Sequence, residues 1–192
     1  MHRTALTAWL LVAFACASSS QRNGSPVDVV KLSGLAFPQY AAGLEARSVS
    51  SLGDPPHDVA FTYARPAARA SGATILVPIA FDSVGGTSLH EVLEAEVAAF
   101  LGGPFGRGQP EVSAVQPIEI VGTDGVTYRG SWATLRAIGD FFEWRFAFQK
   151  QGRVVKYYVH DNGLNPWVTL PFAREFISAT LGEFTVDFPA SF

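Results

Sequence analysis

The chain has 192 residues, a length typical of one domain with a sizeable core. Hydrophobic residues make up 48% of it and charged residues only 16%, which excludes global disorder. The 14 basic and 17 acidic side chains give a formal net charge of -3, so the charge provides no basis for nucleic-acid binding. A single cysteine can form neither an intramolecular disulfide nor a multi-cysteine zinc site.

The first fifteen residues have the form of a signal peptide. Arg3 supplies a positive start, and an apolar stretch interrupted only by Thr7 runs from Ala5 to Ala15. This stretch is too short for a transmembrane anchor, because a helix needs roughly 20 apolar residues to cross the hydrocarbon core. We expect residues 1–15 to be removed, which leaves 13 basic and 17 acidic side chains in the mature chain.

The cysteine directly follows the small-x-small sequence Ala13-Phe14-Ala15. This junction resembles the lipobox of bacterial lipoproteins, in which the cysteine becomes the acylated first residue. The resemblance implies lipidation at Cys16, a polar tether over residues 16–26, and a periplasm-facing position in the bacterial cell envelope. The alternative is ordinary secretion, with cleavage before Cys16 or after Ala17. Residues 27–192 are expected to form a single domain.

The first half of this domain is predicted to be mostly extended. Apolar residues favour short strands at 27–37 and 44–49. A Pro-, Gly- and Asp-rich turn at 53–58 precedes Val59–Tyr63, where apolar side chains alternate with Ala60 and Thr62. A further strand is predicted at Ala73–Ile79, with its end at a sheet edge because Pro78 donates no ladder hydrogen bond.

Two helices are predicted from capping residues and period. Ser88 and Glu91 form the S-x-x-E capping box, and apolar residues then recur at steps of three and four until Gly102. The second helix is expected to begin at Asn165-Pro166 or at Thr169-Leu170-Pro171, since proline is tolerated in a first turn, and to end before Gly182.

Four strands are predicted between the two helices, at 112–121, 126–137, 142–148 and 155–160. Asp124-Gly125 is a two-residue hairpin signal between the first pair, and Gln151-Gly152 turns the second pair. The tail 184–192 is expected to be extended. Tight hairpins join antiparallel neighbours, so we predict an α+β fold, an antiparallel sheet of about six or seven strands packed with two main helices.

This pattern resembles the PsbP/Mog1-like α/β/α sandwich domains over residues 35–181. The resemblance is carried by Phe37-Pro38 leading to Ala42-Gly43-Leu44, by Phe61-Thr62-Tyr63, by Ile75-Leu76-Val77-Pro78 before a helix, and by Lys156-Tyr157-Tyr158 before the last helix. Members of that group act mostly as accessory or assembly proteins and as protein-binding modules. The resemblance therefore implies a non-enzymatic module, and it assigns no catalytic, metal or cofactor-binding residue here.

The histidines do not form a recognisable metal motif. His90 and Glu94 are one helical turn apart, and His160 is a conceivable third ligand, but the HExxH zinc motif requires a second histidine where Glu94 stands. His57 lies in the proline-rich turn and His160 adjoins Asp161 at a strand end; both are expected to be exposed. We expect no metal and no cofactor.

Hydrolase and phosphate-binding motifs are also missing from the sequence. No G-x-S-x-G elbow is present, although Ser83, Ser88 and Ser131 are available as nucleophiles in principle. The Gly-rich stretch at 102–108 follows a helix instead of opening one, and it lacks the Gly-Lys-Ser/Thr ending of a phosphate loop, so it is interpreted as a connector.

Aromatic residues alternate along the strand at 142–148, and Tyr128 and Trp132 share a face of the preceding strand. We interpret these rows as core. The opposite face, which is expected to be solvated or to face a partner, carries Glu143, Arg145, Gln149, Lys156 and His160. The expected function is a non-enzymatic envelope lipoprotein that binds a protein or a small ligand. The alternatives are a carrier of a lipid or apolar ligand, with the aromatic rows around a cavity, and an envelope hydrolase.

Overall fold

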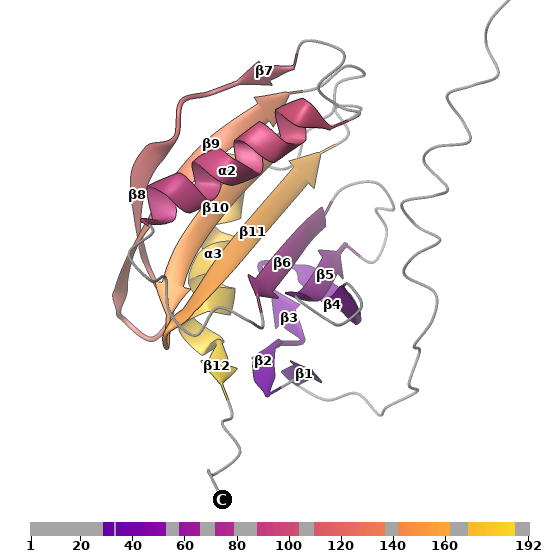
Figure 1. Cartoon of the computed structure of the whole chain (residues 1–192). Coiled ribbons are helices and arrows are strands. Elements are labelled where there is room, and N and C mark those ends of the chain that lie inside the picture. The colour runs from indigo at the N-terminus through magenta and orange to yellow at the C-terminus, as the bar shows by residue number, and fades with distance from the viewer. Residues whose placement is uncertain are drawn as a thin grey trace, which may run out of the picture.

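A computed structural model describes residues 29–32, 34–52, 58–65, 72–78, 88–103, 110–136, 142–161 and 169–186. Figure 1 shows a twisted sheet with one helix in front of it and one behind. Cys16, His57, Ser83 and the expected signal peptide and tether lie outside the described residues, as do most of the Gly-rich connector and of the tail. Neither described helix is long and apolar enough to cross a membrane.

The first half of the described chain is extended, as predicted. Its strands are β1 (Val29–Leu32), β2 (Leu35–Pro38), β3 (Tyr40–Ala41), β4 (Leu44–Leu52), β5 (Asp58–Ala64) and β6 (Gly72–Pro78). The second half contains α2 (Leu89–Gly102), β7 (Glu111–Val112), β8 (Gln116–Val121), β9 (Thr127–Arg136), β10 (Phe142–Lys150), β11 (Arg153–Asp161), α3 (Leu170–Glu183) and β12 (Thr185–Val186).

Every strand pairing in the described chain is antiparallel, which confirms the predicted α+β class. The larger sheet has nine strands in the order β3-β4-β5-β6-β11-β10-β9-β7, with β8 also paired to β9. The expected number was six or seven. The difference arises because the two-residue segments β3 and β7 join the sheet, while β1, β2 and β12 form a separate three-stranded sheet.

Local sequence signals locate the helix starts. The Ser88 hydroxyl accepts from the Glu91 backbone N–H at 3.2 Å, and the Glu91 carboxylate accepts from the Ser88 N–H at 2.7 Å, so the predicted capping box is formed. At α3, Thr169 is the N-cap and Pro171 lies in the first turn, which selects the later of the two predicted starts.

The two predicted hairpins differ in their turns. At the β10–β11 turn, Gln151 and Gly152 both have positive φ, as a two-residue type I′ turn requires. The β8–β9 connection is longer than predicted, because residues 122–126 lie between the paired residues Val121 and Thr127. The Gly122 N–H donates to the Val126 carbonyl at 2.9 Å, which closes this loop.

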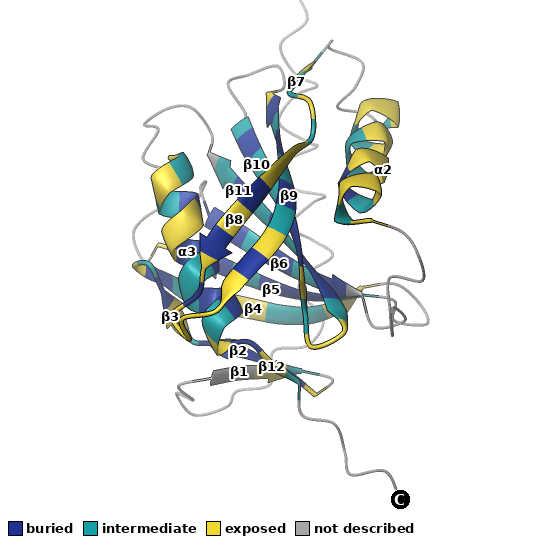
Figure 2. Cartoon of the chain, turned by 90° about the vertical axis from the view of Figure 1, so that its left-hand side faces the viewer, coloured by how far each residue is buried: buried dark blue, intermediate teal, exposed yellow. Residues whose placement is uncertain are grey.

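One face of the large sheet packs on α3 and forms the core. Phe176 of α3 meets the ring of Tyr63 at 5.1 Å and that of Tyr157 at 6.3 Å, in both cases edge-on. The small sheet joins the same core through Phe37, whose ring stacks on Phe184 at 4.6 Å. Figure 2 shows the sheet between the two helices, with dark blue buried residues concentrated on its strands.

We expect Phe176→Ala to lower the free energy of unfolding by about 3–5 kcal/mol, because it removes the aromatic ring at the centre of this core. The matched control is Glu175→Ala, which changes an exposed side chain on the same helix and should have no measurable effect. Urea unfolding followed by circular dichroism measures both. A loss for Phe176→Ala no larger than that of the control would contradict the assignment of the core.

Candidate functional site

The second face of the large sheet is covered by a helix only in part. In Figure 1, α2 lies in front of β9 and β10, whereas no described helix stands in front of β4, β5 and β6. We call the surface formed by β4, β5 and β6 on this side the open half-face. The boundary between the covered and open parts runs along β11.

Strand register determines which side chains share this face, because directly opposed residues of antiparallel neighbours point to the same side. One row contains Ser48, Thr62, Thr74, Tyr158 and Arg145; a second contains Ser50, Ala60, Leu76 and Lys156; a third contains Glu45, Ala64, Gly72, His160 and Glu143; a fourth contains Leu52, Asp58 and Pro78. The centre of the open half-face thus carries small side chains, among them the buried Ala60, while Glu45 and Asp58 lie at its two ends.

Glu96 of α2 is the centre of a polar network at the covered part. Its carboxylate accepts from Lys156 Nζ at 2.8 Å and from the Tyr158 hydroxyl at 2.8 Å, both on β11. Burial by itself would raise the pKa of Glu96, but the hydrogen bonds and the charge of Lys156, with help from Tyr158 and Arg145, hold it below its usual value. Glu96 is therefore a carboxylate at neutral pH and fixes α2 to β11.

Arg145 of β10 makes the second connection to α2. Its Nη1 donates to the backbone carbonyl of Glu96 at 2.9 Å, and its Nε donates to Glu143 Oε1 at 2.7 Å. The guanidinium also lies near the rings of Phe100, at 5.1 Å, and Tyr158, at 5.0 Å. Arg145 and Glu143 were expected to be solvated or to face a partner; instead, Arg145 binds the helix that covers this part of the sheet.

Glu143 is the most deeply buried carboxylate of this network, with only 8% of the residue exposed. Burial raises the pKa of Glu143 above its usual value, although the Arg145 guanidinium opposes the shift. Its second oxygen, Oε2, has no hydrogen bond within the part of the chain that the structure describes. Every fully buried side-chain oxygen and nitrogen there has a partner, so Oε2 must be accessible from outside.

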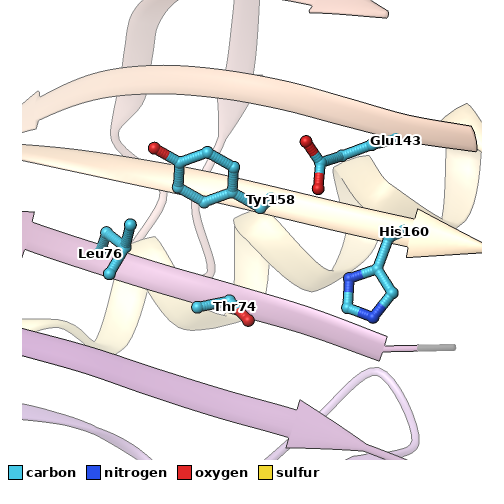
Figure 3. Close-up of a pocket in the computed structure, with 5 residues that line it drawn as sticks. All are labelled: Thr74, Leu76, Glu143, Tyr158 and His160. Carbon is cyan, nitrogen blue, oxygen red and sulfur yellow. The ribbon is translucent and has the colours of Figure 1, made fainter. Parts of the chain in front are cut away.

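A hollow of about 320 Å³ lies where the open half-face meets these charged residues. The described residues that line it are Thr74, Leu76, Glu143, Tyr158 and His160. Figure 3 shows the Glu143 carboxyl group turned toward the Tyr158 ring, while the His160 imidazole points away from it, toward β6. His160 has this room because Gly72, which has no side chain, is its direct neighbour on β6.

The structure separates the histidines and acidic residues that the sequence analysis considered for a metal. His90 Nε2 lies 3.3 Å from Glu94 Oε1 on an exposed turn of α2, whereas His160 lines the hollow on β11. Among the described side chains, no group of three or more histidines, cysteines or acidic residues is arranged to hold a metal ion.

The candidate nucleophiles are not assembled with a base either. Ser88 is occupied as the N-cap of α2, and Ser131 is buried on β9. The hollow does bring His160, Glu143 and the hydroxyl of Thr74 together, but the hydrogen bond of Glu143 goes to Arg145, and none joins it to His160 in the described structure. A chain of hydrogen bonds from nucleophile to base to orienting group is therefore not formed there.

The aromatic rows belong mainly to the core on the other face of the sheet. Phe146 and Phe148 are completely buried, and Trp132 and Trp144 pack against the core from its margin. The hollow thus lies on the face opposite to the one where an apolar cavity was considered.

The sequence analysis missed Glu96 and the accessible oxygen of Glu143. Alternation along β10 and β11 placed Glu143, Arg145 and Lys156 on one face correctly. The rotation of α2 about its own axis is determined by tertiary contacts. The helical period alone therefore could not show which of its three glutamates faces the sheet.

We expect Glu96→Gln to lower the free energy of unfolding by about 1–3 kcal/mol at pH 7, because the amide cannot accept charge-assisted hydrogen bonds from Lys156 as strongly. The folded-state pKa of Glu96 is lowered, so its contribution is present above the ordinary glutamate pKa of 4.5 and is lost as the pH falls through the folded value. Urea unfolding at pH 7 and pH 3.5 should therefore give a smaller difference between wild type and variant at the lower pH.

The control for this prediction is Glu94→Gln on the exposed side of the same helix, which should change little at either pH. If the two glutamate variants lost equal stability at pH 7, or if the Glu96→Gln difference grew on acidification, the assigned network would be wrong.

Comparison with known proteins identifies a related fold. No protein-family model matches the chain, and no curated protein matches it. Among solved structures the chain is similar to the solution structure of cyanobacterial PsbP (CyanoP) from Synechocystis sp. PCC 6803, with a TM-score of 0.51 and 13% sequence identity. The match covers 88% of this chain and 98% of that one. It confirms the fold expected from the resemblance to PsbP/Mog1-like domains: the chain has a PsbP-like fold.

Proposed function

We propose that the protein is a non-enzymatic lipoprotein of the bacterial cell envelope, anchored through Cys16 and facing the periplasm, whose domain binds a partner on the open half-face. The observation that carries the proposal is that, of the helices the structure describes, only α2 packs on this face, and it covers only part of it. The helix α2 occupies β9 and β10, and the neighbouring strands present a row of small polar side chains, among them Ser48, Thr62 and Thr74.

The character of this surface supports binding in preference to chemistry. Small side chains at the centre of this surface leave it without the deep walls that enclose a small molecule, which suits contact with another protein. The buried polar side-chain atoms of the described residues are all paired, and among those residues the hydrogen bond of Glu143 goes to Arg145 and not to a histidine or hydroxyl that could take part in catalysis. The PsbP-like fold is compatible with many functions, and it adds no residue-level assignment.

The sequence supports the location. The apolar stretch and the small residues before Cys16 have the form of a lipoprotein signal. The tether of residues 16–26 spans at most about 40 Å when fully extended, so a domain that begins at residue 27 would remain close to the membrane surface. A single acyl chain binds membranes only marginally, so stable anchoring requires the several chains that bacterial lipoproteins carry.

We expect the full chain, expressed in a bacterial host, to fractionate with membranes and to have an intact mass equal to residues 16–192 plus acyl groups. Cys16→Ser should abolish the added mass and release the protein into the soluble periplasmic fraction, because the acylated atom is the cysteine sulfur. Ser19→Ala is the matched control in the tether and should leave both results unchanged. A wild-type mass without acyl groups would rule out the anchor and leave ordinary secretion.

The binding surface is tested by site-specific photo-crosslinking in the source cells. A photoreactive residue at the exposed Ser48 should give a discrete adduct with a partner, since Ser48 lies on the open half-face. The control places the photoreactive residue at Glu175, which is exposed on α3 at the opposite side of the sheet. This variant should give no crosslinked adduct. No adduct at Ser48, or the same adduct at both positions, would count against the proposal.

A further inference from the structure

The hollow beside the open half-face presents one acceptor that the fold itself does not use. Glu143 is more than nine-tenths buried, and Arg145 occupies only its Oε1. The other oxygen is accessible, as argued above, and Glu143 is one of the residues that line the hollow. A carboxylate oxygen accepts hydrogen bonds and donates none, so a ligand group that binds it must be a hydrogen-bond donor. A cationic donor forms the strongest such bond.

The other walls of the hollow agree with this chemistry. Leu76 and the Tyr158 ring offer apolar surface, and Thr74 and His160 add polar edges (Figure 3). No lysine or arginine is among the described residues that line it, and the two nearby cations are already paired: Arg145 with Glu143 and Lys156 with Glu96. Among the described lining residues, Glu143 is thus the only acidic one, and none of them is a lysine or arginine that would compete with a cationic ligand.

The size restricts the ligand. The hollow has a volume of about 320 Å³ and is open toward solvent, so it does not enclose a ligand as a deep pocket does. This volume suits one charged head group with a short methylene stem. The stem of a lysine or arginine side chain would pack along Leu76 and Tyr158 while its head reaches Glu143.

We propose that the hollow binds an alkylammonium or guanidinium group that donates a hydrogen bond to Glu143 Oε2. The inference rests on the proposed function, because it specifies the chemistry of the partner on the open half-face. The source of the cation is either a basic side chain of a partner protein or a free organic amine, and the two share the same recognition.

The charged groups around Glu143 predict how binding varies with pH. From α2 there is Glu96, from β10 Arg145, and from β11 Lys156 and His160; β6 contributes only the neutral Thr74 and Leu76. Burial raises the pKa of Glu143, so acidification protonates this carboxyl group at a higher pH than an ordinary glutamate with a pKa of 4.5, and protonation removes the negative charge that a cationic ligand needs. Binding should therefore weaken on acidification, and the loss should begin above pH 4.5.

The test is a titration of the folded domain, followed by two-dimensional amide NMR, with three probes. These are butylammonium, the peptide acetyl-Gly-Lys-Gly-amide, and the same peptide with acetylated lysine, which keeps the shape and removes the charge. We expect the lysine peptide to shift the amide signals of Thr74, Tyr158 and His160, and the acetylated peptide to leave them unchanged. Glu143→Gln should weaken binding of the lysine peptide at least tenfold, whereas Glu94→Gln on the outside of α2 should not.

A second variant keeps the test independent of any effect of Glu143→Gln on folding. Thr74→Lys should place a tethered ammonium beside Glu143, so it should block binding of the added probes while Glu143 is retained. Equal binding of the acetylated peptide, unchanged binding in both variants, or no saturable shift with any probe would overturn the proposal. Stronger binding of the peptide than of butylammonium assigns the cation to a partner side chain, and the reverse order assigns it to a free amine.

These outcomes are separate from those of the crosslinking experiment. An adduct at Ser48 together with no cation binding would overturn the inference about the hollow and leave the proposed function standing. Cation binding without an adduct at Ser48 would count against the proposed partner surface and leave the inference about the hollow standing.

Discussion

The arrangement of this domain depends on the contact between Glu96 and the sheet. The helix α2 fully buries only Leu93, whereas α3 buries five side chains, so apolar packing alone specifies the position of α2 weakly. Three polar side chains of the sheet fix the position of α2. Lys156 and Tyr158 donate to the Glu96 carboxylate, and Arg145 donates to the Glu96 backbone carbonyl. The position of α2 in turn decides which strands are covered, where the open half-face begins and where the hollow lies.

The two faces of the sheet bind their helices by different interactions. On the α3 side, complete burial of aromatic rings supplies stability, and the buried tyrosine Tyr63 satisfies its hydroxyl by donating to the Pro38 carbonyl at 2.6 Å. On the α2 side, the carboxylates of Glu96 and Glu143 pair with the cations of Lys156 and Arg145, so that contacts among these groups replace their contacts with water. Such networks contribute less to stability than well-packed apolar groups of the same volume. Stability alone therefore does not explain why this side is charged.

Much of the fold was predictable from the sequence because its signals are local. The capping box of Ser88 and Glu91, the alternation along β10 and the Gln151-Gly152 turn each act within a few residues, and all appear in the structure. The strand count was underestimated, since β3 has only two residues and pairs with the adjacent β4, and β7 has only two residues and forms by pairing with the distant β9. The site was predicted only in part: alternation placed Glu143 on the right face, but the hollow exists because α2 ends its cover at β11, and no local signal determines that boundary.

The position of Glu143 is not explained by the docking of α2. Arg145 docks α2 through its hydrogen bond to the Glu96 carbonyl and its contacts with Phe100 and Tyr158. None of these contacts involves Glu143. Glu143 neutralises the buried guanidinium with one oxygen, and its other oxygen is accessible at the hollow, while burial of the residue raises its pKa. A carboxylate in this position is destabilised by its own desolvation, and a bound cation would relieve that penalty. The same group that completes the internal network is thus the one on which the proposed preference for a cation depends.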